Sequence, residues 1–316
     1  MPAVLWGRQC DGYGDVVVTE PAPGVALALT RGLHPKPYRW VDPNEDVVAA
    51  VVGPRATLLV VADAHNGALA SEVAVQTVLD HVGDDPPEDL DDKELVALFA
   101  HAGGTILAET SARADHQRRE SRTTLSLALI ADHRLRWAAL GDSPVLVVQA
   151  GRGQELTSDS SHFVGWPMAS FQVDRVLQRG RLALADDAWV VVASDGFSNF
   201  TVAATAALGA EAVLSQARYA ADGARGLIEH AFAGGAGDNV ATAVLAPPLR
   251  GSCPAGRTTR IVLEECSPAE SRYACGKGRR AYWSRASGLA RASRLPTSSP
   301  IIIDRTAFST FLPLIV

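Results

Sequence analysis

The sequence has few cysteines, few aromatic residues and no long uninterrupted apolar segment. Four of the 316 residues are cysteines and three of them lie after residue 249, so we expect no disulfide framework in the main body. No segment reaches the roughly 18 apolar residues that a membrane-spanning helix needs. The first residues lack the charged start and apolar run of a secretory signal. We therefore expect a cytoplasmic protein with no membrane partner.

Basic residues are also outnumbered, with 29 Lys and Arg against 35 Asp and Glu and a net charge of −6. This charge does not indicate a nucleic-acid partner. A hydrophobic content of 47% and a charged content of 20% are typical of an ordinary globular protein. Few of the basic residues are lysines and alanine is abundant, which is associated with GC-rich bacterial genomes.

The composition changes abruptly after Pro247 and Pro248. Residues 250–316 have little periodicity, many Ser, Arg and Gly residues, and an excess of basic side chains. We predict a folded domain at 1–249 and a poorly ordered basic tail at 250–316. The tail is either an appendage without a function of its own or a basic docking segment.

Short Val-rich runs bounded by turn residues predict strands, and apolar residues at spacings of three and four predict helices between them. Strands are expected at residues 47–52, 57–62, 123–130, 135–140, 144–149, 188–193 and 240–246. Helices are expected at residues 68–81, 93–113, 201–208, 211–221 and 223–232. Residues 151–187 are predicted to be a long loop that forms a flap. Hairpins with inserted helix pairs favour an α+β fold with antiparallel sheets.

Acidic residues stand at the ends of several predicted strands. Asp46 precedes and Asp63 follows one predicted hairpin, so both lie at its open edge. Asp142 follows the second hairpin, Asp195 follows the strand at 188–193, and Asp238 precedes the last strand. If the last two strands pair antiparallel, their acids also share one edge.

A single acid at a strand end is most often a turn former or a cap. Several at one edge repel one another and stay ionised only where a cation neutralises them. Oxygen ligands without a nearby Cys or His cluster select hard ions such as Mg²⁺ or Mn²⁺, which suit phosphoryl chemistry. The pattern alone therefore predicts a carboxylate-bound metal centre.

Six segments resemble, in order and spacing, the motifs of the metal-dependent protein phosphatases, the PPM or type 2C family. They lie within residues 40–246 and are Asn44–Asp46, Val61–Gly67, Ser121–Thr124, Leu140–Ser143, Ala193–Phe197 and Gly237–Val240. The resemblance implies a four-layer α/β/β/α sandwich of two antiparallel sheets flanked by helix pairs. It also implies hydrolysis of phosphoserine and phosphothreonine on proteins by a water that bridges two Mn²⁺ or Mg²⁺ ions.

The resemblance also assigns metal ligands. Asp63 is expected to bridge the two ions, and Asp195 and Asp238 to complete the first site. The carbonyl of Ala64 is expected to contribute to the second site. Asp142 matches the acid of a third, weaker site.

Four further residues receive roles in the same way. Glu45 and Asp46 are expected to bind metal waters, which places Asp46 in the catalytic machinery. His65 matches the general acid that protonates the departing seryl or threonyl oxygen. Arg39 is the candidate cation for the substrate phosphate, although it stands farther from Asp46 than the family usually allows.

Two positions depart from the family pattern, because Ala64 and Arg122 stand where glycine is usual. If the backbone at Ala64 requires positive φ, alanine there costs about 1 kcal/mol or more. The alternative to an active enzyme is a catalytically weak or inactive family member that acts as a phosphoprotein-binding or regulatory module. The expected partners are a phosphorylated protein and a cognate Ser/Thr kinase, and we expect a monomer.

Overall fold

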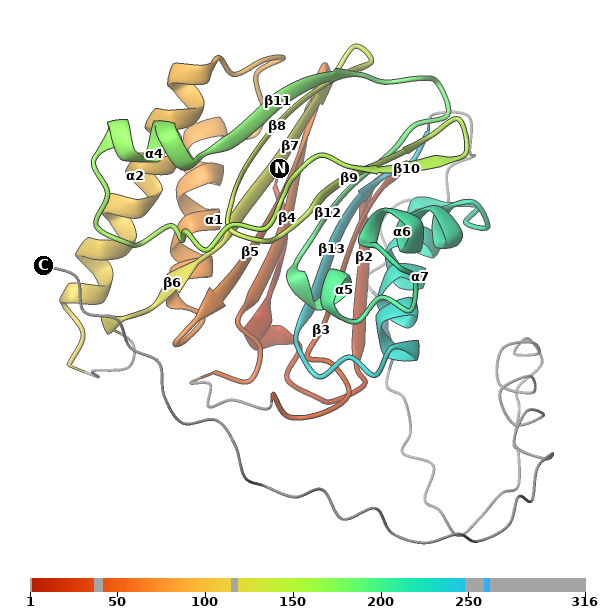
Figure 1. Ribbon diagram of the computed structural model, residues 1–316, viewed down its shortest axis with the longest axis horizontal. Coiled ribbons are helices and arrows are strands. Elements are labelled where there is room, and N and C mark those ends of the chain that lie inside the picture. Colours follow the sequence, from red (N-terminus) through yellow and green to blue (C-terminus); the bar gives the residue numbers. More distant parts are fainter. Residues whose placement is uncertain (1, 37–41, 115–118, 248–258, 262–316) are drawn as a thin grey trace, which may run out of the picture. The chain divides into compact units, whose positions relative to one another are not determined.

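The computed structural model describes residues 2–36, 42–114, 119–247 and 259–261. In these residues two antiparallel β-sheets face each other, and helices cover the outer face of each (Figure 1). This is the predicted four-layer α/β/β/α sandwich. No helix in the described ranges has the length and apolar character needed to cross a membrane.

The first sheet has the strand order β1-β4-β5-β7-β8-β11, with the short β6 paired to the end of β5. Its strands are β1 (Ala3–Trp6), β4 (Asp46–Val52), β5 (Ala56–His65), β6 (Arg122–Thr123), β7 (Leu125–Ala131), β8 (Arg134–Leu140) and β11 (Gln178–Ala183). The central strands are apolar along almost their whole length rather than alternating. This follows because one face packs on helices and the other on the second sheet.

The second sheet has the order β10-β9-β12-β13-β3-β2-β14. Its strands are β2 (Val16–Ala22), β3 (Val25–Thr30), β9 (Val145–Gln149), β10 (Arg152–Glu155), β12 (Trp189–Ala193), β13 (Val240–Leu245) and β14 (Thr259–Ile261). The neighbouring strands β12 and β13 pair antiparallel, as the position of their acids requires.

Helices pack on both outer faces. The described helices are η1 (Gly7–Gln9), α1 (Leu69–Val82), α2 (Asp92–Ser111), α4 (Ser170–Val176), α5 (Asp195–Asn199), α6 (Ala206–Leu214) and α7 (Ala220–Ala233). Helix α1 lies on the first sheet beside α2, while α6 and α7 lie on the second sheet (Figure 1). Phe99 belongs to the apolar layer under α1 and α2, Leu59 to the layer between the sheets, and Phe197 to the layer under α6 and α7.

The structure differs from the predicted elements in four places. The helices predicted at 201–208 and 211–221 are replaced by the single helix α6, and α5 forms at 195–199, where no helix is predicted. The strands β1, β2 and β3 lie before residue 40, where no strand is predicted. The region 151–187 contains β10, α4 and β11 instead of being one long loop. In the predicted tail, Thr259–Ile261 form β14, which pairs with Val16–Val18 of β2, and the rest of 250–316 lies outside the described residues.

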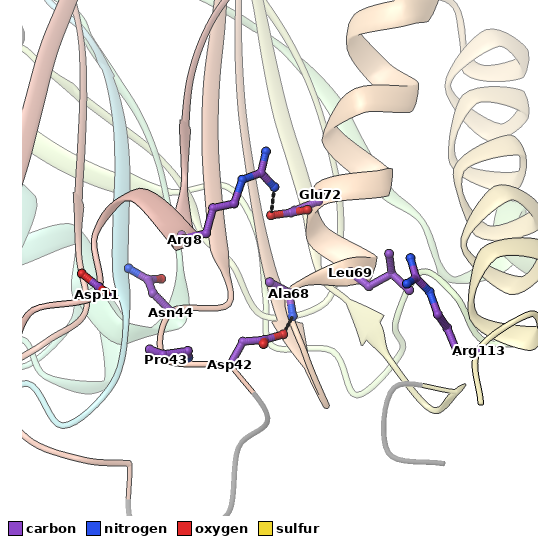
Figure 2. A pocket seen from close by; sticks show the side chains of 10 residues that line it. Arg8, Asp11, Asp42, Pro43, Asn44, Ala68, Leu69, Glu72 and Arg113 are labelled. Carbon is purple, nitrogen blue, oxygen red and sulfur yellow. Dashed lines mark hydrogen bonds and ion pairs between the residues drawn. The ribbon is translucent and has the colours of Figure 1, made fainter. Parts of the chain in front are cut away.

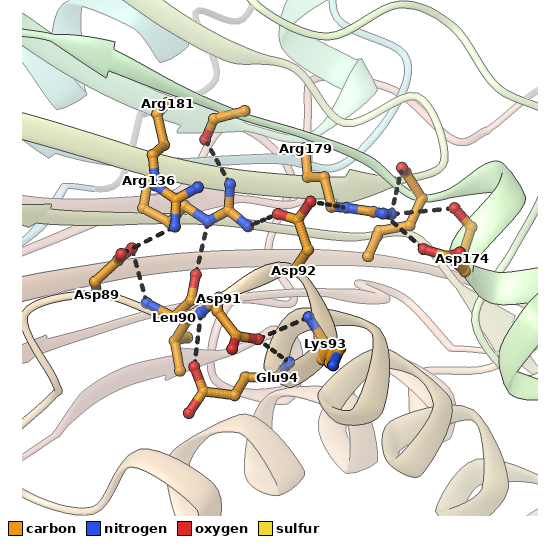
Figure 3. A network of polar contacts seen from close by, with 12 residues as sticks. Asp89, Leu90, Asp91, Asp92, Lys93, Glu94, Arg136, Asp174, Arg179 and Arg181 are labelled. Carbon is orange, nitrogen blue, oxygen red and sulfur yellow. Dashed lines mark hydrogen bonds and ion pairs between the residues drawn. The ribbon is translucent and has the colours of Figure 1, made fainter.

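A buried arginine joins the first sheet to the start of α2 (Figure 3). Arg136 on β8 donates from Nε to the Leu90 carbonyl at 2.8 Å and forms an ion pair with Asp92. The hydrogen bond that Arg136 donates to Asp92 lowers the pKa of that carboxyl. Asp92 also lies 3.5 Å from Arg179 on β11, which pairs with Asp174 at 2.6 Å. The network therefore fixes α2 against two strands at the sheet edge.

We expect Arg136→Met to lower the free energy of unfolding by about 2 kcal/mol, because the Leu90 carbonyl loses its buried donor. Urea denaturation measures the change. Arg134→Met on the same strand removes an exposed arginine and is the control. Equal midpoints for the two variants would contradict a structural role for Arg136.

Candidate active site

The first two acids of the site are direct neighbours across a strand pair. Asp46, the first residue of β4, pairs with Asp63 near the end of β5. Alternate residues of a strand share a face, and Asp63 shares its face with Leu59 and Val61, which belong to the core between the sheets. Both carboxylates are buried. They therefore lie at the inner face of the sandwich, at one end.

The second sheet supplies two more acids at the same end. Asp195 follows β12 and Asp238 precedes β13, and the antiparallel pairing of these strands brings the two positions together. The charges of Asp46 and Asp238 help to raise the pKa of Asp63, and the charges of Asp63 and Asp238 help to raise the pKa of Asp195. The four acids thus form one electrostatic cluster built from both sheets.

Burial disfavours the ionised form of the acids in this cluster. It raises the pKa of Asp46 to about 7, although attraction to Lys36 opposes the rise. Burial, followed by repulsion from neighbouring acids, raises the pKa of Asp63 and Asp195 well above the usual value. Within the described ranges, both oxygens of Asp46 and one oxygen each of Asp142 and Asp195 are buried without a hydrogen-bond partner. Such oxygens are costly unless a cation binds them.

Lys36 is the residue of the site that sequence reasoning missed. Its side chain is buried, and Nζ lies 2.7 Å from Asp238 Oδ1 and 3.5 Å from Glu45 Oε2. Burial lowers the pKa of Lys36, but attraction to Asp63, Asp238 and the other acids outweighs this and raises it. The ammonium is therefore a shared counter-ion of the acids. No local pattern marks it, because Lys36 stands between Pro35 and Pro37, outside every element that the sequence predicts.

The donor chemistry fits a hard divalent cation, since the acids of the cluster contribute buried carboxylate oxygens without a hydrogen-bond partner in the described ranges. Among the described residues, however, no three His, Cys, Asp or Glu side chains are arranged to hold a metal ion. The acids lie around the Lys36 ammonium instead. A cation that bound these acids would compete with that ammonium for their negative charge.

The remaining predicted acids lie close by. Glu45 is buried, accepts a hydrogen bond from the Gly67 amide, and has its pKa raised by burial. Asp142 lies two residues after β8, and burial, with a smaller contribution from the charge of Asp159, raises its pKa. Arg39 lies outside the described residues.

Ala64 is free of the strain that its departure from glycine suggests. Positive φ among described non-glycine residues occurs at Asn66, Asp132, His133 and Ala150, and Ala64 continues β5 as an ordinary strand residue. Its methyl group is buried in the layer between the first sheet and the helices. The turn that needs positive φ comes later, at Asn66 and Gly67.

Hydroxyl side chains hold the backbone of Asp63. Thr124 Oγ1 accepts a hydrogen bond from the Asp63 amide at 3.0 Å, and Thr123 Oγ1 donates to the Asp63 carbonyl at 2.9 Å. Thr124 Oγ1 is also 2.7 Å from Ser143 Oγ. Thr123 and Thr124, which belong to the Ser121–Thr124 motif, therefore position the end of β5, which carries Asp63.

Asn239 connects the two sheets at the site. Its Oδ1 accepts a hydrogen bond from the Glu45 amide at 3.0 Å, and its Nδ2 donates to the carbonyls of Arg31 and Pro43 at 3.1 and 3.2 Å. These contacts place Asp238, the preceding residue, beside Glu45. The role depends on segments almost 200 positions apart, so no spacing in the sequence reveals it.

His65 ends β5, two residues after Asp63. Burial, followed by the charges of Lys36 and Arg122, lowers the pKa of His65 to about 4. The imidazole is therefore neutral at pH 7 in this state. Its ring meets Phe163 edge to face, with the centroids 5.1 Å apart.

A pocket of about 410 Å³ lies beside the start of α1 (Figure 2). Asp42 Oδ2 accepts a hydrogen bond from the Ala68 amide at 2.8 Å, and Arg8 forms an ion pair with Glu72 across the pocket wall. The lining extends to Asn44, the residue before Glu45. The pocket therefore adjoins the acid cluster through the segment that leads into β4.

Solved structures share this fold. The Mycobacterium tuberculosis serine/threonine phosphatase PstP/Ppp is 23% identical in sequence to this chain. The match spans 73% of this chain and 98% of the PstP/Ppp chain, with a TM-score of 0.56. The catalytic domain of PstP in complex with two manganese ions has the same identity and coverage and a TM-score of 0.57. Stp1 from Staphylococcus aureus is 17% identical in sequence to this chain. The match spans 72% of this chain and 96% of the Stp1 chain, with a TM-score of 0.56. No curated protein sequence matches the chain.

The family model for protein phosphatase 2C matches residues 39–224, which is more than half of the chain. The match includes Asp46, Asp63, Asp142 and Asp195 and ends before Asp238. The fold and the cluster of acids agree with this match. The chain therefore belongs to the protein phosphatase 2C family.

Proposed function

We propose that this protein hydrolyses phosphoserine and phosphothreonine on proteins, with Mn²⁺ or Mg²⁺ as the cofactor. The observation that carries the proposal is the cluster of Asp46, Asp63, Asp195 and Asp238, in which both oxygens of Asp46 and one oxygen of Asp195 are buried without a hydrogen-bond partner among the described residues. Membership of the protein phosphatase 2C family supports the same activity. So does the concentration of negative charge at the site, which favours the binding of a cation.

The proposed metal ligands are Asp63 between two ions, Asp195 and Asp238 at the first ion, and the Ala64 carbonyl at the second. Asp142 is proposed for a third ion. When bound, such ions hold and acidify a water and neutralise charge on the phosphoryl oxygens. Glu45 and Asp46 are proposed to hold waters around them.

His65 is proposed to donate a proton to the departing oxygen. A phosphate dianion beside the ring favours the charged imidazolium, and so raises the pKa of His65 from its low value. Arg39 is proposed as a cation for the phosphate, on the resemblance alone. A cognate Ser/Thr kinase, a monomeric state and a cytoplasmic location also stay predictions.

The test is hydrolysis of p-nitrophenyl phosphate and of a phosphothreonine peptide by the full chain after metal removal. We expect no turnover without metal, recovery on addition of Mn²⁺, and abolition by EDTA. Bis-p-nitrophenyl phosphate is the control for a phosphodiesterase. Full turnover by metal-stripped protein would refute the metal dependence, and hydrolysis of the diester alone would refute the monoesterase.

A second candidate is a phosphoprotein-binding module without catalysis. Two observations favour it. The Lys36 ammonium lies among the acids, and in the described part of the chain no three His, Cys, Asp or Glu side chains are arranged to bind a metal ion. Binding of a phosphothreonine peptide without any turnover at saturating Mn²⁺ would establish this alternative.

A further inference from the structure

Arg122 stands beside the candidate site, at a position where the family usually has glycine. It is the first residue of β6 and pairs directly with His65 of β5. Directly opposed residues share a face, with Cβ atoms roughly 4.5–5.5 Å apart. His65 follows Asp63 by two positions and therefore continues the row of the acids. The register thus brings Arg122 onto the catalytic face, next to His65.

Two aromatic rings hold the guanidinium. Its Cζ lies 5.1 Å from the centroid of Phe163 and 5.8 Å from that of Trp166, and the two rings meet each other edge to face at 5.3 Å. Stacking of this kind orients an arginine while leaving its N–H groups free to donate.

The loop that carries these rings is attached to the same strand. Thr123 and Val164 exchange two backbone hydrogen bonds of 3.0 and 2.8 Å. Val164 is buried, and Gly165 adopts a φ of 100° where a Cβ would lie 2.8 Å from a methyl group of Ile106. These contacts hold the backbone segment that carries Phe163 and Trp166 beside Arg122.

Arg122 has no anionic partner among the described residues. Its Nε is buried without a hydrogen-bond acceptor, and no carboxylate in these ranges forms an ion pair with it. Arg136, Arg179 and Arg181, in contrast, each pair with an aspartate. A buried donor left without an acceptor is unfavourable. The geometry suits an oxyanion that the protein itself does not supply.

We propose that Arg122, oriented by Phe163 and Trp166, binds the phosphoryl oxygens of the substrate next to His65. The proposal rests on the proposed phosphatase function. A planar guanidinium donates two parallel hydrogen bonds to a phosphate, which an ammonium does not reproduce. Because Arg122 is opposite His65, the ligand is the phosphoryl group at the reaction centre rather than an acidic side chain elsewhere in the substrate.

The test compares Arg122→Met and Arg122→Lys with the unchanged full chain, all loaded with Mn²⁺. We expect Arg122→Met to raise the KM for p-nitrophenyl phosphate and the inhibition constant of inorganic phosphate by about tenfold each, the effect of losing a charged hydrogen bond. Arg122→Lys should recover only part of this loss. Arg175→Met, which removes an exposed arginine from α4, is the matched control and should change neither constant.

A second readout does not need turnover. Trp166 lies against the guanidinium, so phosphate binding should change its fluorescence, and Trp166→Phe should remove that signal. The dissociation constant of phosphate measured in this way should rise about tenfold in Arg122→Met. Thermal unfolding and Mn²⁺ titration of each variant verify that the fold and metal binding are intact.

The outcomes are separable. An unchanged phosphate constant in folded, Mn²⁺-binding Arg122→Met would overturn the proposal, as would a defect confined to peptides with an acidic neighbour of the phosphoresidue. An unchanged full chain that shows no phosphatase activity refutes the proposed function. In that case the fluorescence titration still decides whether Arg122 binds phosphate.

Discussion

Asp63→Asn is expected to lower kcat by at least about 100-fold at saturating Mn²⁺. Asp63 is buried at the centre of the cluster, and its charge is felt by both Lys36 and Asp195. Asparagine keeps the shape of the side chain but removes the charge that the proposed bridging role requires. Loss of a ligand or of its support typically lowers metal affinity or activity 10- to 100-fold or more. Steady-state hydrolysis of p-nitrophenyl phosphate measures the loss.

The fold should survive this change. The backbone of Asp63 is held by Thr123 and Thr124, which do not touch its carboxylate. Removal of one buried like charge should leave the thermal stability of the metal-free protein equal or higher. Asp142→Asn should have a smaller effect on kcat, and exposed Asp132→Asn should have none. Wild-type rates in Asp63→Asn would refute the bridging role.

Lys36→Met is expected to destabilise the metal-free protein by about 3 kcal/mol, because the buried acids then lose their counter-ion. It should also tighten Mn²⁺ binding by about tenfold or more, since the ammonium no longer competes for the carboxylates. Thermal unfolding of the metal-free protein and calorimetric Mn²⁺ titration measure the two effects. Neither measurement depends on catalysis.

The pH dependence gives a further check. The folded pKa of Asp46 is raised to about 7, above its value in the unfolded chain. Between these values the folded state binds more protons, so stability falls as the pH rises toward 7. The deficit of Lys36→Met should therefore be largest above pH 7 and shrink toward pH 4.

The control for this prediction is Lys93→Met, which removes an exposed lysine at the start of α2. It should change neither the stability nor the Mn²⁺ affinity appreciably. Weaker Mn²⁺ binding in Lys36→Met would show that Lys36 supports the metal centre instead of competing with the ion.

The sequence by itself determined the class of fold and the row of acids. Strands have a period of two, and hairpins bring their ends together, so Asp46 and Asp63 can be placed at one edge from their positions alone. The observed register pairs these two residues directly. The same reasoning placed Asp195 and Asp238, because β12 and β13 are adjacent and antiparallel.

Several strands escaped prediction. The strands β1 to β3 are short apolar runs before residue 40, outside the recognised motifs. Strand β14 lies in a segment of polar, basic composition, and its pairing with β2 is a property of the sheet edge rather than of its own residues. Pairing between distant segments is decided by packing, which a local pattern does not encode.

Only the tertiary structure decided what surrounds the acids. Lys36 becomes their counter-ion, Asn239 ties together segments nearly 200 residues apart, and Arg122 meets the rings of Phe163 and Trp166. The backbone also shows that Ala64 needs no positive φ. Periodicity determines which face of a strand a residue occupies. Its charge environment depends on side chains from other segments, which come together only when the sheets and loops have packed.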